Sequence, residues 1–180
     1  MNETTAPRGV LIRPAITADM AEITRIYAFA VDHGTATFEI DPPDQAEMAR
    51  RHAALVANGY PYLVAERGDS IAGYAYAGTY RARPAYRWSV EDSIYIAPEF
   101  HRQGIGSALL ARLIAEAEAG GFRQMIAVIG DSAQIPSIAV HARACFAHIG
   151  TLRAVGFKHG RWLDTVLMQR PLGSSDTAPP

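Results

Sequence analysis

The feature that most constrains the fold is a strand that leads through a glycine-marked turn directly into an amphipathic helix. Residues 90–97 alternate in character, with Val90, Asp92, Ile94 and Ile96 facing one way. Pro98 ends this strand, and Gly104-Ile105-Gly106 opens a helix whose apolar residues keep helical spacing as far as Gly120-Gly121. A strand followed at once by a helix is typical of α/β sheets, so the segment favours that fold class.

The same turn has the properties of an anion site. A helix N-terminus leaves its first amides unpaired and carries a partial positive charge. Glycines 104 and 106 let a ligand approach those amides, and Arg102 and Ser107 add donors, so a pyrophosphate would fit. The alternative is that the two glycines only let strand and helix pack closely. A Rossmann fingerprint would need a third glycine and a P-loop would need Gly-Lys-Ser/Thr, and neither is present.

Strand and helix signals alternate along the rest of the chain. Apolar runs predict strands at 10–13, 62–66, 71–78, 125–129, 155–157 and 165–169. Helices are predicted from the cap Thr17, from Asp41-Pro42 to Asn58-Gly59, and over 136–148. The first helix carries one apolar stripe, formed by Met20, Ile23, Ile26, Tyr27 and Val31. We therefore predict a mixed α/β domain over 10–172, with helices on both faces of a central sheet and flexible tails at 1–9 and 173–180.

Composition excludes several classes of protein. The 180 residues suit one domain, and 49% apolar residues suffice for a core. A net charge of −1 disfavours a general nucleic-acid binder. The single cysteine, Cys145, rules out an intramolecular disulfide and fits a reducing cytosol. Neither a signal peptide nor a membrane-spanning apolar run is recognisable, so we expect a cytoplasmic protein with no membrane partner.

The chain resembles the GNAT acetyltransferase superfamily in the loop H-R-Q-G-I-G-S-A-L-L, which follows the strand E-D-S-I-Y-I-A-P. The strings GYAYAGTYRARPAYRWSVE, AVIG…PSIAVH and LRAVGFKHGRW are similar to the phosphinothricin and methionine sulfoximine N-acetyltransferase family. The similarity covers about residues 10–171. It implies a GNAT fold with splayed central strands, acetyl-CoA as co-substrate, no metal, and a homodimer.

The resemblance also assigns the residues that would bind acetyl-CoA. Backbone groups of Ile94, Tyr95 and Ile96 would pair with the pantetheine arm, and an N–H there would stabilise the oxyanion. The pyrophosphate would lie on His101, Arg102, Gln103, Gly104, Ile105, Gly106 and Ser107. Position 101 is Gln or Arg in the superfamily pattern, so this histidine is a departure. Gln134 and Ser137 stand where the superfamily often has Asn and Ser.

Two residues are expected to carry the chemistry. Glu91 would be the base, because an α-ammonium group must lose a proton before its nitrogen can attack. His141 would be the general acid toward the CoA thiolate, at the position where many superfamily members place a tyrosine. Asp92 faces the other side of a regular strand, so only one of the two acids should reach the amine. The alternative for Glu91 is an ordinary exposed strand residue.

Substrate binding is assigned to a basic loop and an aromatic side chain. Arg81, Arg83 and Arg87 place three positive charges within seven residues, and the resemblance favours Arg81 and Arg83 as partners of the acidic groups of the substrate. Phe38 would wall the pocket. The alternatives are a solvated loop for the arginines and a core position for Phe38.

Other interpretations of the chain stay open. On a helix over 136–148, His141, Cys145 and His148 would share one face and could bind zinc. Alternatively, Cys145 would be a nucleophile activated by His141, or it would simply be a small residue of the core. The favoured function is acetyl transfer from acetyl-CoA to the α-amine of a small amino-acid-like substrate of the phosphinothricin, methionine sulfoximine or methionine sulfone type. The alternatives are acetylation of another amine, such as a protein N-terminus, and a non-catalytic acyl-CoA-binding module.

Overall fold

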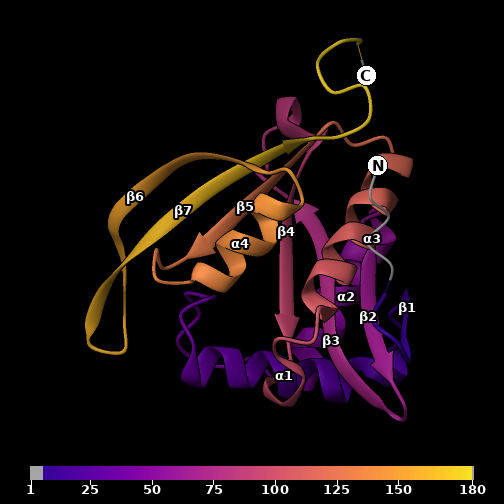
Figure 1. The fold of residues 1–180 in the computed structure, drawn as a ribbon, viewed down its shortest axis with the longest axis vertical. Coiled ribbons are helices and arrows are strands. Elements are labelled where there is room, and N and C mark those ends of the chain that lie inside the picture. Colours follow the sequence, from indigo (N-terminus) through magenta and orange to yellow (C-terminus); the bar gives the residue numbers. More distant parts are fainter. Residues whose placement is uncertain (1–5, 180) are drawn as a thin grey trace.

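The computed structural model describes residues 6–179 and contains one seven-stranded mixed sheet in the order β1-β2-β3-β4-β5-β7-β6 (Figure 1). The strands are β1 (Val10–Pro14), β2 (Tyr62–Arg67), β3 (Ser70–Thr79), β4 (Ser89–Ile96), β5 (Gln124–Gly130), β6 (Ala147–Lys158) and β7 (Arg161–Pro171). The helices are α1 (Met20–His33), α2 (Gln45–Ala57), α3 (Ile105–Ala119) and α4 (Ile135–Arg143). Short 3-10 turns occupy Thr17–Asp19, Pro84–Tyr86 and Pro98–Phe100.

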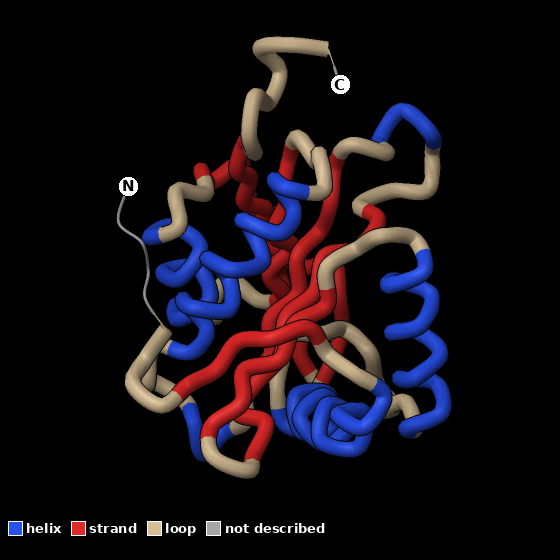
Figure 2. The backbone as a smooth tube through the Cα atoms, turned by 90° about the vertical axis from the view of Figure 1, so that its right-hand side faces the viewer, coloured by secondary structure: helices blue, strands red, loops and turns tan. Residues whose placement is uncertain are grey.

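Helices cover both faces of the sheet, as predicted (Figure 2). On one face, α1 and α2 pack against β2 and β3, and the whole predicted stripe of α1 is buried there. On the other face, Leu109, Leu110 and Leu113 of α3 lie in a second core with the opposite sides of the central strands. Each buried stripe removes apolar surface from water, which is the main driving force for assembling these layers.

The two central strands separate partway along their length. β4 and β5 are parallel and pair only from Ser89–Gln124 to Asp92–Ala127, whereas β3 stays paired with β4 as far as Ile96. Beyond Asp92, no strand within residues 6–179 pairs with the edge of β4 that faces β5, and Figure 1 shows the two arrows diverging. The predicted splayed arrangement is thus confirmed, and it opens the sheet at its centre.

Two helix starts differ from the predictions. The second helix begins at Gln45 rather than after Asp41-Pro42, because the carboxylate of Asp44 accepts the Glu47 N–H at 2.8 Å and forms the cap. Thr17 does not cap α1, because Thr17–Asp19 forms a separate 3-10 turn, in which Asp19 accepts the Ile16 N–H.

The predicted helix over 136–148 ends at Arg143. Cys145 adopts a left-handed backbone conformation with φ of 64°, and β6 begins at Ala147. His141, Cys145 and His148 therefore do not share a helical face, and Cys145 is exposed rather than in the core. Within residues 6–179, the structure contains no cluster of three or more potential metal ligands. The zinc interpretation loses its geometric basis.

The predicted tails lie only partly within the described residues. Residues 1–5 and 180 fall outside them, and Pro7 accepts a hydrogen bond from the Val10 N–H. At the other end, Ser175 accepts a hydrogen bond from Gln124, and the Pro179 carbonyl accepts one from Arg123. Among the helices of residues 6–179, none is both long and apolar enough to span a membrane.

Candidate active site

A cavity of about 320 Å³ lies where β4 and β5 separate. One part of its wall comes from the α1 face of the sheet and includes Tyr27, Tyr76 and Glu91. Another part comes from the opposite face and includes Asp92 and His141. Because successive residues of a strand point to opposite faces, a cavity that reaches both Glu91 and Asp92 passes through the sheet.

Glu91 lies half-buried in this cavity, directly across from Gly78 of β3. The pKa of its carboxyl is raised to about 7, mainly by burial and also by the neighbouring charge of Asp92, while the charge of Arg81 opposes both effects. A carboxylate with a pKa near neutrality is suited to accept a proton at physiological pH. The structure thus gives Glu91 the surroundings that a general base requires.

His141 reaches the cavity from α4 and is fixed at both ring nitrogens. Its Nδ1 lies 2.8 Å from the carbonyl oxygen of Ser137, and its Nε2 lies 2.9 Å from Oδ2 of Asp92. Both side chains of the Asp92–His141 pair are almost completely buried. Burial lowers the pKa of His141, but the hydrogen bond and charge of Asp92 outweigh it, so the pKa lies above its usual value.

Three tyrosines, Tyr27, Tyr76 and Tyr95, form much of the α1-side wall. The sequence did not assign Tyr27 and Tyr76 to the site, and it assigned Tyr95 through its backbone groups alone. The rings of Tyr27 and Tyr95 meet edge to face with centroids 5.0 Å apart. Burial raises the pKa of Tyr27 to about 12, so its hydroxyl stays neutral and donates or accepts hydrogen bonds. The available signals were the alternating tyrosines of β3 and the place of Tyr27 on the apolar stripe of α1, but both patterns are equally typical of a buried core.

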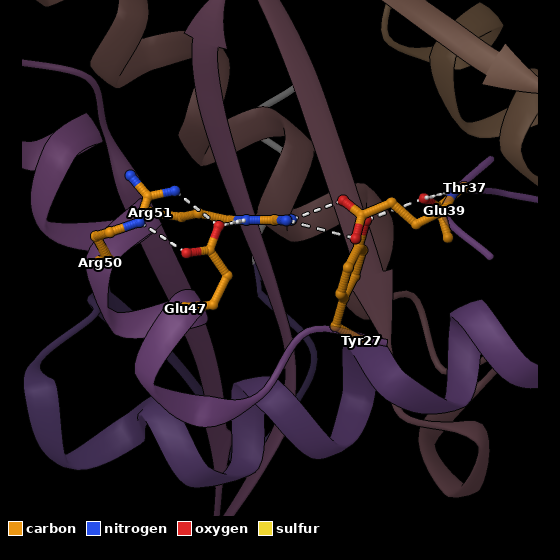
Figure 3. A network of polar contacts seen from close by, with 6 residues as sticks. All are labelled: Tyr27, Thr37, Glu39, Glu47, Arg50 and Arg51. Carbon is orange, nitrogen blue, oxygen red and sulfur yellow. Dashed lines mark hydrogen bonds and ion pairs between the residues drawn. The ribbon is translucent and has the colours of Figure 1, made fainter. Parts of the chain in front are cut away.

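The segment from Thr35 to Glu39 forms one rim of the cavity and is anchored at several points. The Tyr27 hydroxyl lies 2.9 Å from Oγ1 of Thr37, and Figure 3 shows both beside Glu39. Arg51 of α2 bridges Glu39 at 2.6 Å and Glu47 at 2.8 Å. These contacts tie the rim to both helices of the α1 face.

A second set of contacts holds the rim from the side of β6 and β7. Thr35 donates to the carboxylate of Asp131, which also pairs with Arg161 at 2.6 Å. The ammonium group of the buried Lys158 donates to the Thr37 carbonyl at 3.0 Å. Burial lowers the pKa of this ammonium group. Nothing in the spacing of residues singles out Lys158, since only the tertiary fold brings it to Thr37.

Phe38 lines the cavity, as the resemblance implies, and rests on glycines. A Cβ on Gly156 would lie 2.3 Å from the Phe38 ring, and one on Gly130 would lie 2.9 Å from it. Contacts that short cannot exist, so the position of Phe38 depends on these two residues being glycine. The ring is also partly exposed, which suits a pocket wall better than a core residue.

The predicted pyrophosphate loop lies at the end of β4, outside the cavity walls. Its backbone takes left-handed conformations at Arg102 and Gly104, and the first turn of α3 closes with Ala108 N donating to Gly104 O. The amides of Ile105, Gly106 and Ser107 precede that bond, so they are open to an anion. The Ile105 side chain is buried, so only its backbone faces a ligand.

Other predicted site residues lie around this frame. Nε2 of His101 lies 3.0 Å from the Ile96 carbonyl, and Gln103 contacts Arg67 and donates to Glu99 O. Gln134 donates to Thr35 at 3.0 Å at the start of α4 rather than lining the cavity.

Ile94, Tyr95 and Ser137 line the cavity together with Glu91 and His141. Arg81 and Arg83 are exposed on the loop between β3 and β4 and are not among the lining residues. The guanidinium group of Arg81 lies over the Tyr80 ring at 5.2 Å, and its charge reaches Glu91.

The sequence matches the model of the acetyltransferase (GNAT) domain over residues 12–167. It is 54% identical over 162 residues to phosphinothricin N-acetyltransferase from Alcaligenes faecalis, a match covering 90% of this chain and 82% of that protein. It is 38% identical to the L-methionine sulfoximine/L-methionine sulfone acetyltransferase of Salmonella typhimurium, covering 89% and 94% of the two chains.

A solved structure extends the likeness to three dimensions. The crystal structure of a GNAT superfamily phosphinothricin acetyltransferase from Sinorhizobium meliloti in complex with acetyl-CoA superposes with a TM-score of 0.92. The two chains are 50% identical, and the match covers 96% of this chain and 93% of the other. Together with the splayed sheet and the glycine-marked turn before α3, these matches confirm the resemblance: the chain belongs to the GNAT acetyltransferase family.

Proposed function

We propose that this protein transfers the acetyl group of acetyl-CoA to the α-amine of a small amino-acid-like substrate of the phosphinothricin, methionine sulfoximine or methionine sulfone type. The observation that carries the proposal is the cavity at the β4–β5 opening, with the half-buried Glu91 on its wall. The names of the relatives supply the substrate class.

Acetyl-CoA fits the surfaces at the end of β4. The unpaired backbone edge of Ile94, Tyr95 and Ile96 offers hydrogen-bonding groups to an extended pantetheine arm. The open amides at the start of α3, with Arg102 and Ser107 beside them, offer donors to a diphosphate. A backbone N–H near Ile96 would then donate to the thioester oxygen as negative charge develops on it.

In the proposed reaction, Glu91 takes a proton from the substrate ammonium group and frees its lone pair. The amine nitrogen forms a bond to the thioester carbon, and the carbon–sulfur bond breaks with its electron pair passing to sulfur. The nitrogen gives up two protons in all, both passing through Glu91 to solvent, and the sulfur takes up one proton. The raised pKa of Glu91 makes this acceptance favourable near pH 7.

Substrate selection would come from the rim. Arg81 and Arg83 would hold carboxylate and phosphinate or sulfoximine oxygens at the mouth of the cavity, and Phe38 would contact the apolar part of the side chain. Such a recognition scheme favours a free amino acid over a protein N-terminus, whose first residue carries no free α-carboxylate.

We also propose that the protein is a homodimer. The hairpin of β6 and β7 exposes at least half of five large apolar side chains, namely Ile149, Leu152, Val155, Phe157 and Trp162. Exposed apolar surface of this kind commonly marks a protein interface. Light scattering on the purified protein tests this, since a monomer mass at micromolar concentration would contradict it. The cytoplasmic location stays a prediction from the sequence.

An acetylation screen that detects the free thiol of CoA tests the function. Phosphinothricin, methionine sulfoximine and methionine sulfone should be acetylated, whereas their α-N-methylated or carboxamide forms and short peptides should be poor substrates. Peptide acetylation at the higher rate would support the N-terminal acetyltransferase alternative. Binding of acetyl-CoA without turnover of any amine would support a non-catalytic module.

A further inference from the structure

The surroundings of His141 determine which of its atoms carry protons. The Ser137 carbonyl can only accept a hydrogen bond, so the 2.8 Å contact requires a proton on Nδ1. The 2.9 Å contact between Nε2 and Asp92 then contains one shared proton. Either the carboxyl of Asp92 holds this proton beside a neutral ring, or the ring holds it as an imidazolium beside a carboxylate.

The imidazolium form is favoured by the ordinary acidities of the two groups. A carboxyl group of aspartate loses its proton near pH 4 and an imidazolium near pH 6.5, so the ring is the stronger base. The other oxygen of the Asp92 carboxylate, Oδ1, is buried and has no hydrogen-bond partner among residues 6–179. Protonated His141 is therefore the group that neutralises this carboxylate.

The remaining neighbours do not change this assignment. On the cavity walls, the titratable groups besides the pair are Glu91 of β4, Tyr27 of α1, and Tyr76 and Tyr95 of β3 and β4. Burial raises the pKa of all four, which keeps the tyrosines neutral near pH 7. The cavity-lining residues of β5 and β7 carry no ionisable side chain. On α4, Arg143 follows His141 in the last turn.

We propose that Asp92 is a positioning residue that keeps His141 as a doubly protonated imidazolium, so that His141 acts on the departing sulfur as a fixed cation. The proposal rests on the proposed acetyl transfer. The sulfur leaves with the electron pair of the broken carbon–sulfur bond and is stabilised as a thiolate by the adjacent charge. The thiolate takes a proton from solvent after CoA dissociates, and both ring protons of His141 stay in place throughout.

Nitrogen-15 NMR of histidine-labelled protein tests the charge state without any turnover. In the parent protein at pH 7, His141 should show both ring nitrogens protonated. In Asp92→Asn, the side-chain amide can donate to Nε2, so the ring should be neutral with a proton on Nδ1 alone. The pKa of His141 should fall by about 1 to 3 pH units, the usual effect of removing an adjacent opposite charge.

Asp19→Asn is the matched control, because Asp19 is also a buried acid in an ion pair, with Arg13 at 2.7 Å, outside the cavity. It should leave the protonation of His141 unchanged. A neutral His141 ring in the parent protein at pH 7 would overturn the proposal, and this measurement does not depend on whether Asp92→Asn folds.

Kinetics supply the second test. The decline of kcat at alkaline pH should move to lower pH in Asp92→Asn by the same amount as the pKa of His141, while the Kd of acetyl-CoA stays near the parent value. An unmoved pH profile despite a shifted His141 pKa would refute the role of the cation in the reaction. Absence of amine acetylation in the parent protein would refute the proposed function instead and leave the NMR result standing.

Discussion

Replacing Glu91 by glutamine is expected to make the protein more stable and less active at the same time. In the unfolded chain the carboxyl ionises near pH 4.5, whereas in the folded protein burial raises its pKa to about 7. Between these values the unfolded state holds the charge more easily, so the parent protein loses stability as pH rises from 4.5 through 7. Glutamine carries no charge at any pH and escapes this loss.

The size of the effect follows from the shift. At about 1.4 kcal/mol for each pH unit, the full rise in pKa would amount to about 3 kcal/mol. Glu91 is only half-buried, and solvent screens part of the charge, so we expect a gain of about 1–2 kcal/mol for Glu91→Gln above pH 7.5. Below about pH 4 the difference between the two proteins should nearly vanish, because the parent carboxyl is then mostly protonated in both the folded and the unfolded state.

Urea unfolding of both proteins at pH 5 and pH 8 measures this, with Asp69→Asn in the exposed β2–β3 turn as the control. Steady-state rates on the same samples should show kcat near pH 7.5 lowered about 10²- to 10⁴-fold, the usual contribution of a general base. Parent kcat/KM should rise with pH through about 7, below the alkaline pH range in which His141 would lose its proton. A stability difference that is the same at both pH values would refute the claim that burial raises the pKa of Glu91. An unchanged kcat would refute the role of Glu91 as the base.

Three further substitutions address binding and shape. Gly106→Val should weaken acetyl-CoA binding in calorimetry. The variant should still fold, because a Cβ at this position meets only Ile96, at 3.8 Å. Unchanged affinity would exclude the loop from the diphosphate site. Arg81→Ala should lower kcat/KM about tenfold for acidic substrates and much less for their amides. Equal losses for both kinds of substrate would make the arginine structural. Gly156→Ala should displace Phe38, lower the stability by about 1–3 kcal/mol, and change the relative kcat/KM of short and long substrates. If the substrate preference is unaltered, Phe38 does not determine specificity.

The fold was predictable from the sequence where burial alone decides the pattern. The stripe of α1 is buried at every predicted position. Along β4, Val90, Ile94 and Ile96 pack on the α3 side of the sheet, as the predicted alternation requires. The start of α2 was not predictable, because Asp41 and Asp44 are both suitable caps, and in the folded chain it is Asp44 that accepts the Glu47 N–H. The end of α4 depends on the left-handed backbone conformation of Cys145, which could not be predicted because such positions are usually glycine.

The candidate site was predictable only in part, for a related reason. Glu91 and His141 are 50 positions apart, and the resemblance rather than any local pattern identified them as one site. The hydrogen bond between His141 and Asp92, and the anchoring of Thr37 by Lys158, arise from tertiary packing across distant strands and helices. Neither leaves a signal in the spacing of residues, since each partner alone reads as an ordinary polar residue of its element.

The opening between β4 and β5 explains how adjacent acids can have different roles. In a closed sheet, Glu91 and Asp92 would point into separate layers and share no ligand. Here β5 leaves β4 immediately after Asp92, so the cavity is continuous from the tyrosine wall to α4 and both carboxylates border it. In the proposed mechanism the amine is deprotonated on the side of Glu91 and the sulfur departs on the side of His141. The reacting thioester would then lie between a face that accepts protons, at Glu91, and a face that stabilises the departing sulfur, at His141. A shift of β4 by one residue would exchange the faces to which Glu91 and Asp92 point.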